Sequence, residues 1–452
     1  MKRYVISACV ALTLLLPIAW VGFDNFYDGV DTQDTAENDN DNQDADSEED
    51  AQILRTLESR GAYLSRAGNC MSCHTQPGGE PYAGGRVFET PFGRVYASNL
   101  TPDETTGIGK WNTQHFWRAL HHGRSYDGRL LTPVFPYNHT TLITRDDADA
   151  LFAYLISLPP VEQRVPAHDL RWPYGTQAAL AVWRSLNFKP AEFKAASHQS
   201  NEWNRGAYLV QGLGHCAACH STRNGMGATG AVDDLRGGMM WGTNWYAPSL
   251  LNDKETQLGS TSVLETMRLL QTGRNQHRWV TGPMKEVVQH SLQYLTPSDL
   301  RAMAVYLQTE TQNHLPTKTT SASTQNAQAL AWQTSVSAES RNNGAKLYVQ
   351  QCANCHGQYG EGLEDVYPAL TRNKAVLMSN PTNLVQSVLY GGFSVSTSAQ
   401  PRPHGMPPYV LVMSDADIAD VLTHIRQRWG NQAPPVSELD VAKVRGASSK
   451  IR

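Results

Sequence analysis

Three stretches of the chain resemble one another: RGAYLSRAGNCMSCH (residues 60–74), RGAYLVQGLGHCAACH (residues 205–220) and NGAKLYVQQCANCHG (residues 343–357). Each has the composition of a helix that delivers a pair of cysteines at its end. Similarity that recurs along a chain indicates that one structural unit is repeated. We therefore expect three copies of one unit, each opening with a helix that leads into a cysteine motif.

Each stretch carries the motif CxxCH, which is typical of covalent haem attachment. Two thiols three residues apart can each add to one vinyl group of a haem, and the following histidine then lies under the iron as its proximal ligand. A zinc site needs four ligands, commonly two such pairs, and a redox dithiol needs no histidine. The threefold repetition favours three covalently bound haem c groups. The predicted attachment residues are Cys70, Cys73, Cys216, Cys219, Cys352 and Cys355, with His74, His220 and His356 as iron ligands.

The units also close alike. TRDDADALFAYL (residues 144–155), TPSDLRAMAVYL (residues 296–307) and SDADIADVLTHI (residues 414–425) each begin with Thr or Ser followed three residues later by Asp. This pattern is typical of a capped helix start, and the apolar residues recur at helical spacing. The sequence predicts an all-α protein with three tandem cytochrome c-like domains behind an N-terminal signal or membrane anchor.

Composition sets the predicted boundaries between these parts. The residues between the second and third units are rich in Thr, Ser, Gln and Asn, which indicates a flexible linker, and we expect the C-terminal residues to be frayed. The predicted segments are a signal or anchor (1–23), an acidic disordered tether (24–50), domain 1 (51–163), an ordered connector (164–200), domain 2 (201–310), a flexible linker (311–339), domain 3 (340–430) and a C-terminal tail (431–452).

The N-terminus, MKRYVISACVALTLLLPIAWVGF, has a short basic start and then an apolar run. From Val5 to Phe23 a helix would reach roughly 28 Å at about 1.5 Å per residue, which just spans a bilayer. The run lacks a clean small-x-small cleavage site, which favours an uncleaved anchor over a cleaved signal peptide. In both cases the basic residues at the N-terminus stay on the cytoplasmic side of the membrane. The predicted location is the periplasmic side of a bacterial cytoplasmic membrane.

Charge is unevenly distributed along the chain. Residues 24–50 hold 12 acidic and no basic side chains, so this segment repels itself and cannot bury a core. We interpret it as a solvated tether, with a docking segment for a basic partner as the alternative. When the basic residues Lys2 and Arg3 of the N-terminus are also set aside, the formal net charge of −4 leaves +6 on the rest of the chain. Haem propionates would offset about that much, so the excess does not indicate a nucleic-acid partner.

Methionines upstream of two closing helices are candidates for the sixth iron ligand. A methionine opposite histidine raises the reduction potential of a haem. In domain 3, HGMPPY offers Met406, which we favour over Met413 because Met413 adjoins the cap of the closing helix. In domain 2, GPMKEV offers Met284, with His290 as a weaker competitor.

Domain 1 has no methionine between Cys73 and the end of its closing helix. Aligned by Pro-Tyr, VFPYN and MPPY place Phe135 where Met406 stands, and phenylalanine cannot bind iron. His139 on the same loop can bind it, so we predict His139 as the sixth ligand. Another histidine of the domain (His115, His121 or His122) and a vacant site stay open as alternatives. With two histidine ligands, this haem should have a lower reduction potential than the haems that have one histidine and one methionine ligand.

At these residues the chain resembles the triple-haem cytochrome c subunits of bacterial membrane-bound dehydrogenases for alcohol, gluconate, sorbitol and aldehyde. The resemblance covers residues 51–430 and rests on NLTPDETTGIGKW (residues 99–111), GPM with QYLT (residues 282–284 and 293–296), and MPP followed by VMSDADI (residues 406–408 and 412–418). It implies a periplasmic catalytic subunit of flavin, quinone or molybdenum type that supplies electrons, and membrane ubiquinone that accepts them.

The chain departs from that family in two features. Phe135 and His139 stand where many members have a methionine, a variant that resembles cytochromes beside molybdenum-containing aldehyde or N-heterocycle dehydrogenases. The long acidic tether is also unusual for the family.

The favoured function is an electron-transfer subunit that passes electrons to ubiquinone or another respiratory acceptor, without catalytic residues of its own. One alternative is a free-standing periplasmic electron carrier. The other is a haem peroxidase, which needs an open iron and nearby acid–base groups. Domain 1, with Arg118, His121, His122 and Arg124, is the candidate for that chemistry.

Overall fold

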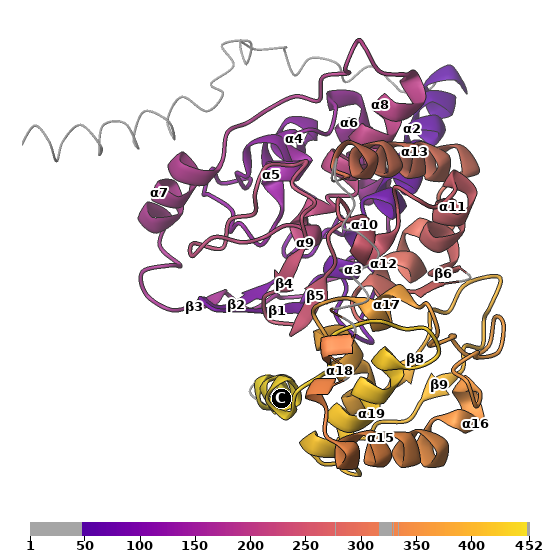
Figure 1. Ribbon diagram of the computed structural model, residues 1–452. Helices are drawn as coiled ribbons and strands as arrows, with labels where there is room; N and C mark the ends of the chain where they lie inside the picture. The colour runs from indigo at the N-terminus through magenta and orange to yellow at the C-terminus, as the bar shows by residue number, and fades with distance from the viewer. Residues whose placement is uncertain (1–47, 276, 316–327, 329, 333, 450–452) are drawn as a thin grey trace, which may run out of the picture. The chain divides into compact units, whose positions relative to one another are not determined.

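The computed structural model describes residues 48–449 except 276, 316–327, 329 and 333 (Figure 1). The predicted anchor, most of the predicted tether and the middle of the predicted linker lie outside these residues. None of the helices within the described part of the chain is both long and apolar enough to cross a membrane.

The protein is rich in helices. Their bounds are α2 (Glu48–Ala67), α3 (Cys70–Cys73), α4 (Thr113–His122), α5 (Tyr137–Thr140), α6 (Arg145–Ser157), α7 (Gln177–Asn187), α8 (Asn201–Ala207), η1 (Tyr208–Leu213, a π-helix), α9 (Ala217–His220), α10 (Asp253–Thr256), α11 (Val263–Thr272), α12 (Met284–His290), η2 (Leu292–Tyr294, a 3₁₀-helix), α13 (Pro297–Asn313), α15 (Ala338–Gln351), α16 (Ala353–His356), α17 (Lys374–Leu377), α18 (Thr382–Tyr390), α19 (Asp415–Gln427) and α20 (Glu438–Ser449).

Short antiparallel strands, which the all-α prediction omitted, join the helices. The bounds are β1 (Val87–Thr90), β2 (Gly93–Tyr96), β3 (Asp169–Leu170), β4 (Gly238–Met240), β5 (Trp245–Ala247), β6 (Arg274–Asn275), β7 (Arg278–Trp279), β8 (Gly392–Phe393) and β9 (Gly405–Met406). They pair in the order β1-β2-β3, β4-β5, β6-β7 and β8-β9. Strands of two to four residues carry too few side chains for a period-two pattern to show in the sequence.

The described residues fall into two compact units. The first comprises the residues up to Lys194 together with Gln211–His215 and Asn224–Ala228. The second comprises Ala195–Val210, Cys216–Arg223 and the residues from Thr229 onward. The predicted domains 2 and 3 therefore share one compact unit, for the most part.

One helix pair recurs three times in the described chain: α2 with α6, α8 with α13, and α15 with α19 (Figure 1). A glycine lies at each crossing, and a Cβ there would lie about 2 Å from a carbonyl oxygen of the partner helix. The pairs are Gly61 with Ala150 (1.9 Å), Gly206 with Ala302 (2.0 Å) and Gly344 with Asp420 (2.3 Å). Because only glycine lets the backbones approach this closely, the shared glycine of the three opening stretches fixes each crossing.

The residue before each glycine bonds to the closing helix. Arg60 pairs with Asp147 at 2.6 Å and Arg205 pairs with Asp299 at 2.8 Å. The three predicted caps are confirmed, since Thr144, Thr296 and Ser414 each accept the N–H of the Asp three residues later. In the first two repeats that Asp also pairs with the arginine of the opening helix.

The helices overrun three predicted boundaries. Helix α2 begins at Glu48, inside the predicted tether, because acidic residues are favoured in the first turn of a helix. Helix α13 continues to Asn313, beyond the predicted start of the linker. The prediction of a frayed C-terminal tail is wrong for 438–449: helix α20 buries Val441 and Val444 in an apolar cluster with Ile418 and Leu422 of α19.

Candidate functional site

The three CxxCH motifs fold into the same helical turn. The amide of each histidine donates to the carbonyl of the first cysteine: His74 to Cys70 (3.0 Å), His220 to Cys216 (2.9 Å) and His356 to Cys352 (2.9 Å). Residues three apart on a helical turn lie on the same face. The six cysteines are partly buried. Each turn therefore presents two thiols side by side, followed by an imidazole.

Each motif histidine is held by a backbone carbonyl at Nδ1. The acceptors are Ser98 for His74 (2.8 Å), Pro248 for His220 (2.7 Å) and Pro368 for His356 (2.9 Å). A proton on Nδ1 that is donated to a carbonyl leaves the lone pair on Nε2. Histidines that bind metals through one ring nitrogen commonly donate the other N–H in this way. The three rings are thus prepared for ligation through Nε2.

Glycine shapes the loop that brings this carbonyl to each ring. Gly84, Gly237 and Gly362 donate their N–H to the carbonyl of His74, His220 and His356 at 2.7, 2.7 and 2.8 Å. All three have positive φ, and a Cβ would lie within 2.6 Å of the backbone of the carbonyl-bearing loop. Larger residues would push that loop away from the imidazole.

Burial keeps these groups uncharged. It lowers the pKa of His74, His220 and His356, so each imidazole is neutral and can offer a lone pair. Burial, together with a smaller effect of the neighbouring cysteine, raises the pKa of the Cys70 and Cys216 thiols to about 12. The pKa of Cys352 rises to about 11 for the same reasons.

These features fit a covalently attached haem. Paired thiols on one turn suit attachment to two vinyl groups, and the imidazole with its Nδ1–H bonded suits axial ligation. A zinc site needs further ligands, and the described residues hold no cluster of three or more His, Cys, Asp or Glu side chains that could bind a metal. The donor set therefore fits a haem better than a bare metal ion.

The predicted ligand Met406 lies in strand β9 and packs against the apolar cluster around Tyr348, Leu389 and Ile418. Cys352 packs against the same cluster. The competing residue Met413 is itself a member of that core, with only 6% of its surface exposed. The structure therefore brings Met406 and the third cysteine motif to one apolar region.

Met284 is the first residue of α12 and is partly buried. His290, the competing residue, is the last residue of the same helix. Among the other methionines of this region, Met303 is a core residue, whereas Met226 and Met239 are exposed.

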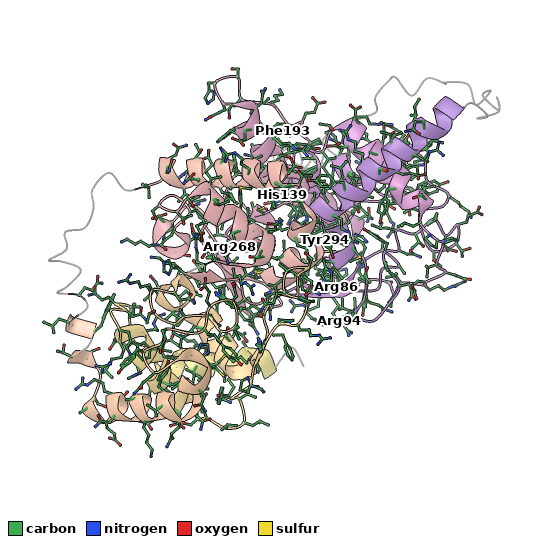
Figure 2. All side chains as sticks on the ribbon, turned by 90° about the vertical axis from the view of Figure 1, so that its right-hand side faces the viewer. Arg86, Arg94, His139, Phe193, Arg268 and Tyr294 are labelled. Atoms are coloured by element: carbon green, nitrogen blue, oxygen red, sulfur yellow. The ribbon has the colours of Figure 1, made fainter. Side chains whose placement is uncertain are left out.

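His139 lies in α5 and is fully buried (Figure 2). Its Nδ1 lies 3.0 Å from the carbonyl oxygen of Gln211. This contact repeats the pattern of the three motif histidines, in which a carbonyl binds Nδ1. Phe135 instead joins the apolar cluster of Tyr137, Trp183, Phe188 and Ala228.

The carbonyl of Gln211 is directed to His139 by the π-helix η1. In a helix this carbonyl would accept the N–H of His215, or of Cys216 in a π turn. The N–H of His215 instead bonds to Gly212 (3.1 Å), and that of Cys216 bonds to Val210 (3.0 Å). The sequence contained a signal: Arg205 and Cys216 are eleven residues apart, whereas Arg60 and Cys70 are ten apart. An extra residue in a helix commonly forms a π turn.

His215 was not singled out from the sequence. It makes a second contact of the segment Gln211–His215 within the first unit. Its Nε2 lies 3.2 Å from the carbonyl oxygen of Gly68, two residues before Cys70. His215 is strained, with a positive φ of 40°. Within the first unit, the segment before Cys216 thus touches both the turn before the first motif and the loop of His139.

The residues named for peroxidase chemistry lie on α4 and in the loop that follows it, and α4 packs against α5, which carries His139. Arg118 donates to the carbonyls of Ser125 (3.2 Å) and Tyr126 (2.9 Å), and Arg124 donates to Gly128 (3.3 Å). His121 stacks on Trp117, with ring centroids 4.4 Å apart. These contacts give both arginines a structural role in the loop that follows α4.

Comparison with known proteins gives one family model and several relatives. Residues 339–425 match the model described as cytochrome c oxidase, cbb3-type, subunit III. The chain is 38% identical over 411 residues to the cytochrome c subunit of an alcohol dehydrogenase (quinone) from Gluconacetobacter polyoxogenes, covering 87% of this chain and 85% of that protein. It is 36% identical to the gluconate 2-dehydrogenase cytochrome c subunit of Pantoea cypripedii, covering 88% and 91% of the two chains.

A third relative is a longer protein. Over 385 residues the chain is 38% identical to a nicotinate dehydrogenase subunit from Pseudomonas putida, covering 83% of this chain and 30% of that one. The match to the alcohol and gluconate proteins extends over nearly their full length, whereas the match to this one is confined to a part of it.

Proposed function

Because the chain belongs to the family of cytochrome c subunits of bacterial membrane-bound dehydrogenases, we propose that it accepts electrons from a periplasmic dehydrogenase subunit and delivers them to membrane ubiquinone or another respiratory acceptor. Membership of the family implies electron transfer through haem c. The proposed partner rests on the relatives named above, and the proposed acceptor rests on the resemblance of residues 51–430 to this family.

We propose three cytochrome c domains (51–163, 201–310 and 340–430), each with one covalent haem c. Haems 1, 2 and 3 are numbered by chain order. The observation that carries this proposal is the threefold agreement of the CxxCH turns, in each of which a carbonyl binds Nδ1 of the histidine. Three crossings of an opening and a closing helix at a glycine support the same division.

The protein's own residues position and shield the redox group. When bound, a haem c supplies a one-electron ferric–ferrous couple. The cysteine pairs would hold it covalently and the motif histidines would ligate it through Nε2, while the carbonyls of Ser98, Pro248 and Pro368 keep each ring in one orientation. Burial lowers the local dielectric constant, and the choice of the opposite ligand sets the potential.

We propose Met284 and Met406 as the distal ligands of haems 2 and 3, and His139 as that of haem 1. Full burial and the Gln211 contact at 3.0 Å support His139. Its imidazole is a stronger donor to ferric iron than a thioether, so haem 1 should have the lowest potential of the three.

The proposed location is the periplasmic side of the cytoplasmic membrane, with the segment 1–23 as its anchor. The partner is a dehydrogenase catalytic subunit, because the relatives named above are subunits of alcohol and gluconate dehydrogenases. The cofactor of that partner, whether flavin, quinone or molybdenum, depends on which dehydrogenase it is.

The mass of the exported protein tests the haem number. We expect the mass of the polypeptide plus three haems, and the loss of one haem in a Cys352→Ser, Cys355→Ser double variant. A control with Cys9→Ser should retain all three. Fewer than three haems on the wild-type protein would contradict the proposal.

Purification under mild conditions tests the partner. A dehydrogenase subunit should copurify with the membrane-bound protein, and the complex should reduce a ubiquinone analogue when its organic substrate is added. Recovery of the cytochrome alone, with full electron-carrying activity between separate complexes, would instead identify a free-standing carrier.

A further inference from the structure

We propose that Lys285 links the distal sides of haems 2 and 3, where its ammonium group positions the Met406 hairpin and raises the reduction potential of both haems together. This inference rests on the proposed function, because it takes Met284 and Met406 as iron ligands. It concerns residues of the second compact unit alone.

Lys285 follows Met284 directly in α12. Its Nζ donates to the carbonyl oxygen of Phe393 at 2.8 Å, across 108 residues of sequence. A Cβ on Gly392 would lie 3.5 Å from the same Nζ. The side chain thus reaches from the first turn of α12 to strand β8.

Strand β8 pairs with the strand that carries Met406. Gly392 is opposite Met406, and Phe393 is opposite Gly405 in the β8–β9 register. Directly opposed Cα atoms in an antiparallel pair lie about 4.5 to 5.5 Å apart. One ammonium group therefore stands next to Met284 in the sequence and one strand away from Met406.

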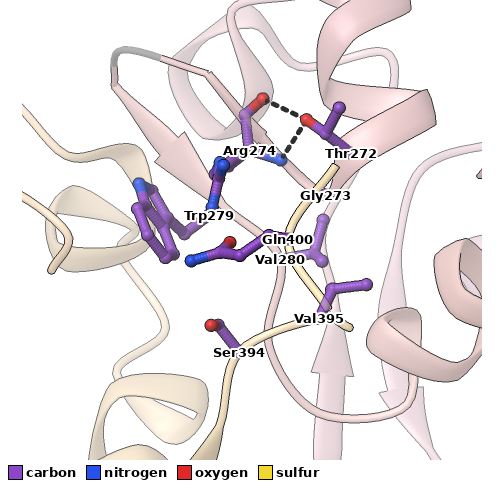
Figure 3. Close-up of a pocket in the computed structure, with 8 residues that line it drawn as sticks. All are labelled: Thr272, Gly273, Arg274, Trp279, Val280, Ser394, Val395 and Gln400. Carbon is purple, nitrogen blue, oxygen red and sulfur yellow. Dashed lines mark hydrogen bonds between the residues drawn. The ribbon is translucent and has the colours of Figure 1, made fainter. Parts of the chain in front are cut away.

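Further contacts hold the loop after β8 against the second repeat. The N–H of Ser398 donates to Oε1 of Gln293 at 3.1 Å. Gly273 lies so close to Val395 that a Cβ would approach its Cγ2 to 2.7 Å. Figure 3 shows the residues around this contact, which line a small pocket that is partly open to solvent. The Lys285 bond is thus part of a packed contact between the two repeats.

The charge has a predictable effect on both irons. A ferric haem carries one more positive charge than a ferrous haem, so a nearby ammonium group disfavours the ferric state and raises the reduction potential. The Coulomb energy falls with distance and with dielectric constant, and a partly buried site weakens it less than bulk water does. A group between the two distal sides should therefore raise both potentials.

The test is a redox titration of the purified holoprotein, followed by optical and electron paramagnetic resonance spectra. In Lys285→Gln, which keeps a donor for Phe393 but has no charge, the potentials of two haems should fall together. Lys285→Arg should restore both. Lys254→Gln is the matched control, because Lys254 is an exposed lysine of the same unit. Haem 1 should keep its potential in every variant.

Separate variants test the ligands. Met284→Gln and Met406→Gln should each remove one equivalent of the sulfur-to-iron charge-transfer absorption, and retention of both equivalents would refute the proposed ligands. If the absorption is lost as expected but Lys285→Gln shifts no potential, or only one, the inference about Lys285 is overturned while the ligands stand. An equal shift in all three haems, or in Lys254→Gln, would also overturn it.

Discussion

The closing helices of the three repeats differ in the residue that bonds to the Asp of their cap. Arg60 and Arg205 take the carboxylates of Asp147 and Asp299. In the third repeat the equivalent residue is Asn343, a neutral donor that contacts Asp417 at 3.1 Å. Asp417 also accepts the amide N–H of Ser414 at Oδ2 (3.2 Å) and completes a reciprocal capping box. The sequence pattern predicted the caps. It did not predict that the carboxylate of the cap also bonds to the opening helix, because that partner lies about 90 positions away in the chain.

The sixth ligand of haem 1 is the most direct test at the level of residues. His139→Met should raise the potential of one haem, because a thioether is a weaker donor to ferric iron than an imidazole. His139→Ala should alter the spin state of that haem alone. Electron paramagnetic resonance spectra of the oxidised protein measure both effects. Three unchanged haem signals in His139→Ala would show that His139 is not a ligand.

The crossing glycines should tolerate no side chain. In Gly206→Ala the new Cβ would lie 2.0 Å from the carbonyl oxygen of Ala302, so the helices must move apart. We expect a loss of about 1 to 3 kcal/mol in the free energy of unfolding, as for other overpacked sites. Gly446→Ala is the control, since a Cβ there meets no atom within 4 Å. Equal stability of the two variants in denaturant titrations would contradict this account.

Among the described elements, η1 is the one whose shape follows from a difference in length. The extra residue between Arg205 and Cys216 was visible in the sequence. Its consequence was not, because a count of residues does not say which carbonyl leaves the helical ladder or what it meets. In the structure this carbonyl is that of Gln211, and the group that it contacts is Nδ1 of His139.

Deleting Gly214 should restore the ten-residue spacing found in the first repeat. The carbonyl of Gln211 would then return to the helical ladder and release Nδ1 of His139. A hydrogen bond at Nδ1 increases the donor strength of the ring, so its loss should raise the potential of haem 1 and shift its resonance signal. Gly214→Ala keeps the length and serves as the control. An unchanged haem 1 signal, with all haems still attached by mass, would refute the role of η1.

Helix α19 should make the stability of its unit depend on pH. Burial and the nearby Arg428 lower the pKa of His424 to about 4, from an ordinary value of 6.5. Below pH 6.5 His424 therefore binds a proton in the unfolded chain but stays neutral in the folded chain. Stability should be full above pH 6.5 and fall as the pH drops from 6.5 towards 4.

Thermal unfolding of wild type and His424→Gln between pH 7.5 and 4 measures this contribution. The variant should lose less stability over that range, because it lacks the titrating ring. His314→Gln is a comparison in which the substituted histidine lies on an exposed helix end. Parallel pH profiles for wild type and His424→Gln would contradict the assignment.

Across the whole molecule, the repeats were predictable from the sequence but their grouping was not. Cysteine motifs, helix caps and shared glycines recur along the chain and can be recognised without coordinates. The second and third repeats are joined by contacts such as that of Asn383 with Tyr246, which no local sequence pattern predicts. Helix α20 was missed for a related reason, because its buried residues Val441 and Val444 pack against α19, and that contact is not visible in the local sequence.

Asn383 should stabilise the second unit as a whole. Its buried amide accepts the N–H of Tyr246 at 2.8 Å and donates to the carbonyl of the same residue at 2.7 Å. Asn383→Leu leaves both main-chain groups without these bonds, which should reduce the free energy of unfolding by about 1 to 3 kcal/mol. Hydrogen exchange should also speed up at Tyr246. The exposed substitution Gln350→Leu should change neither quantity, and equal effects in both variants would count against a role for Asn383.

The border between the two compact units crosses the chain several times, since Gln211–His215 and Asn224–Ala228 belong with the residues up to Lys194. A gene truncated after Lys194 would therefore encode a fragment that lacks pieces of its own unit. It would lose the Gln211 carbonyl at His139 and the Met226 carbonyl that accepts the indole N–H of Trp183. Chimeras between relatives should exchange the segment through Ala228 together with the N-terminal part, because a junction placed between the first two repeats would mismatch both halves.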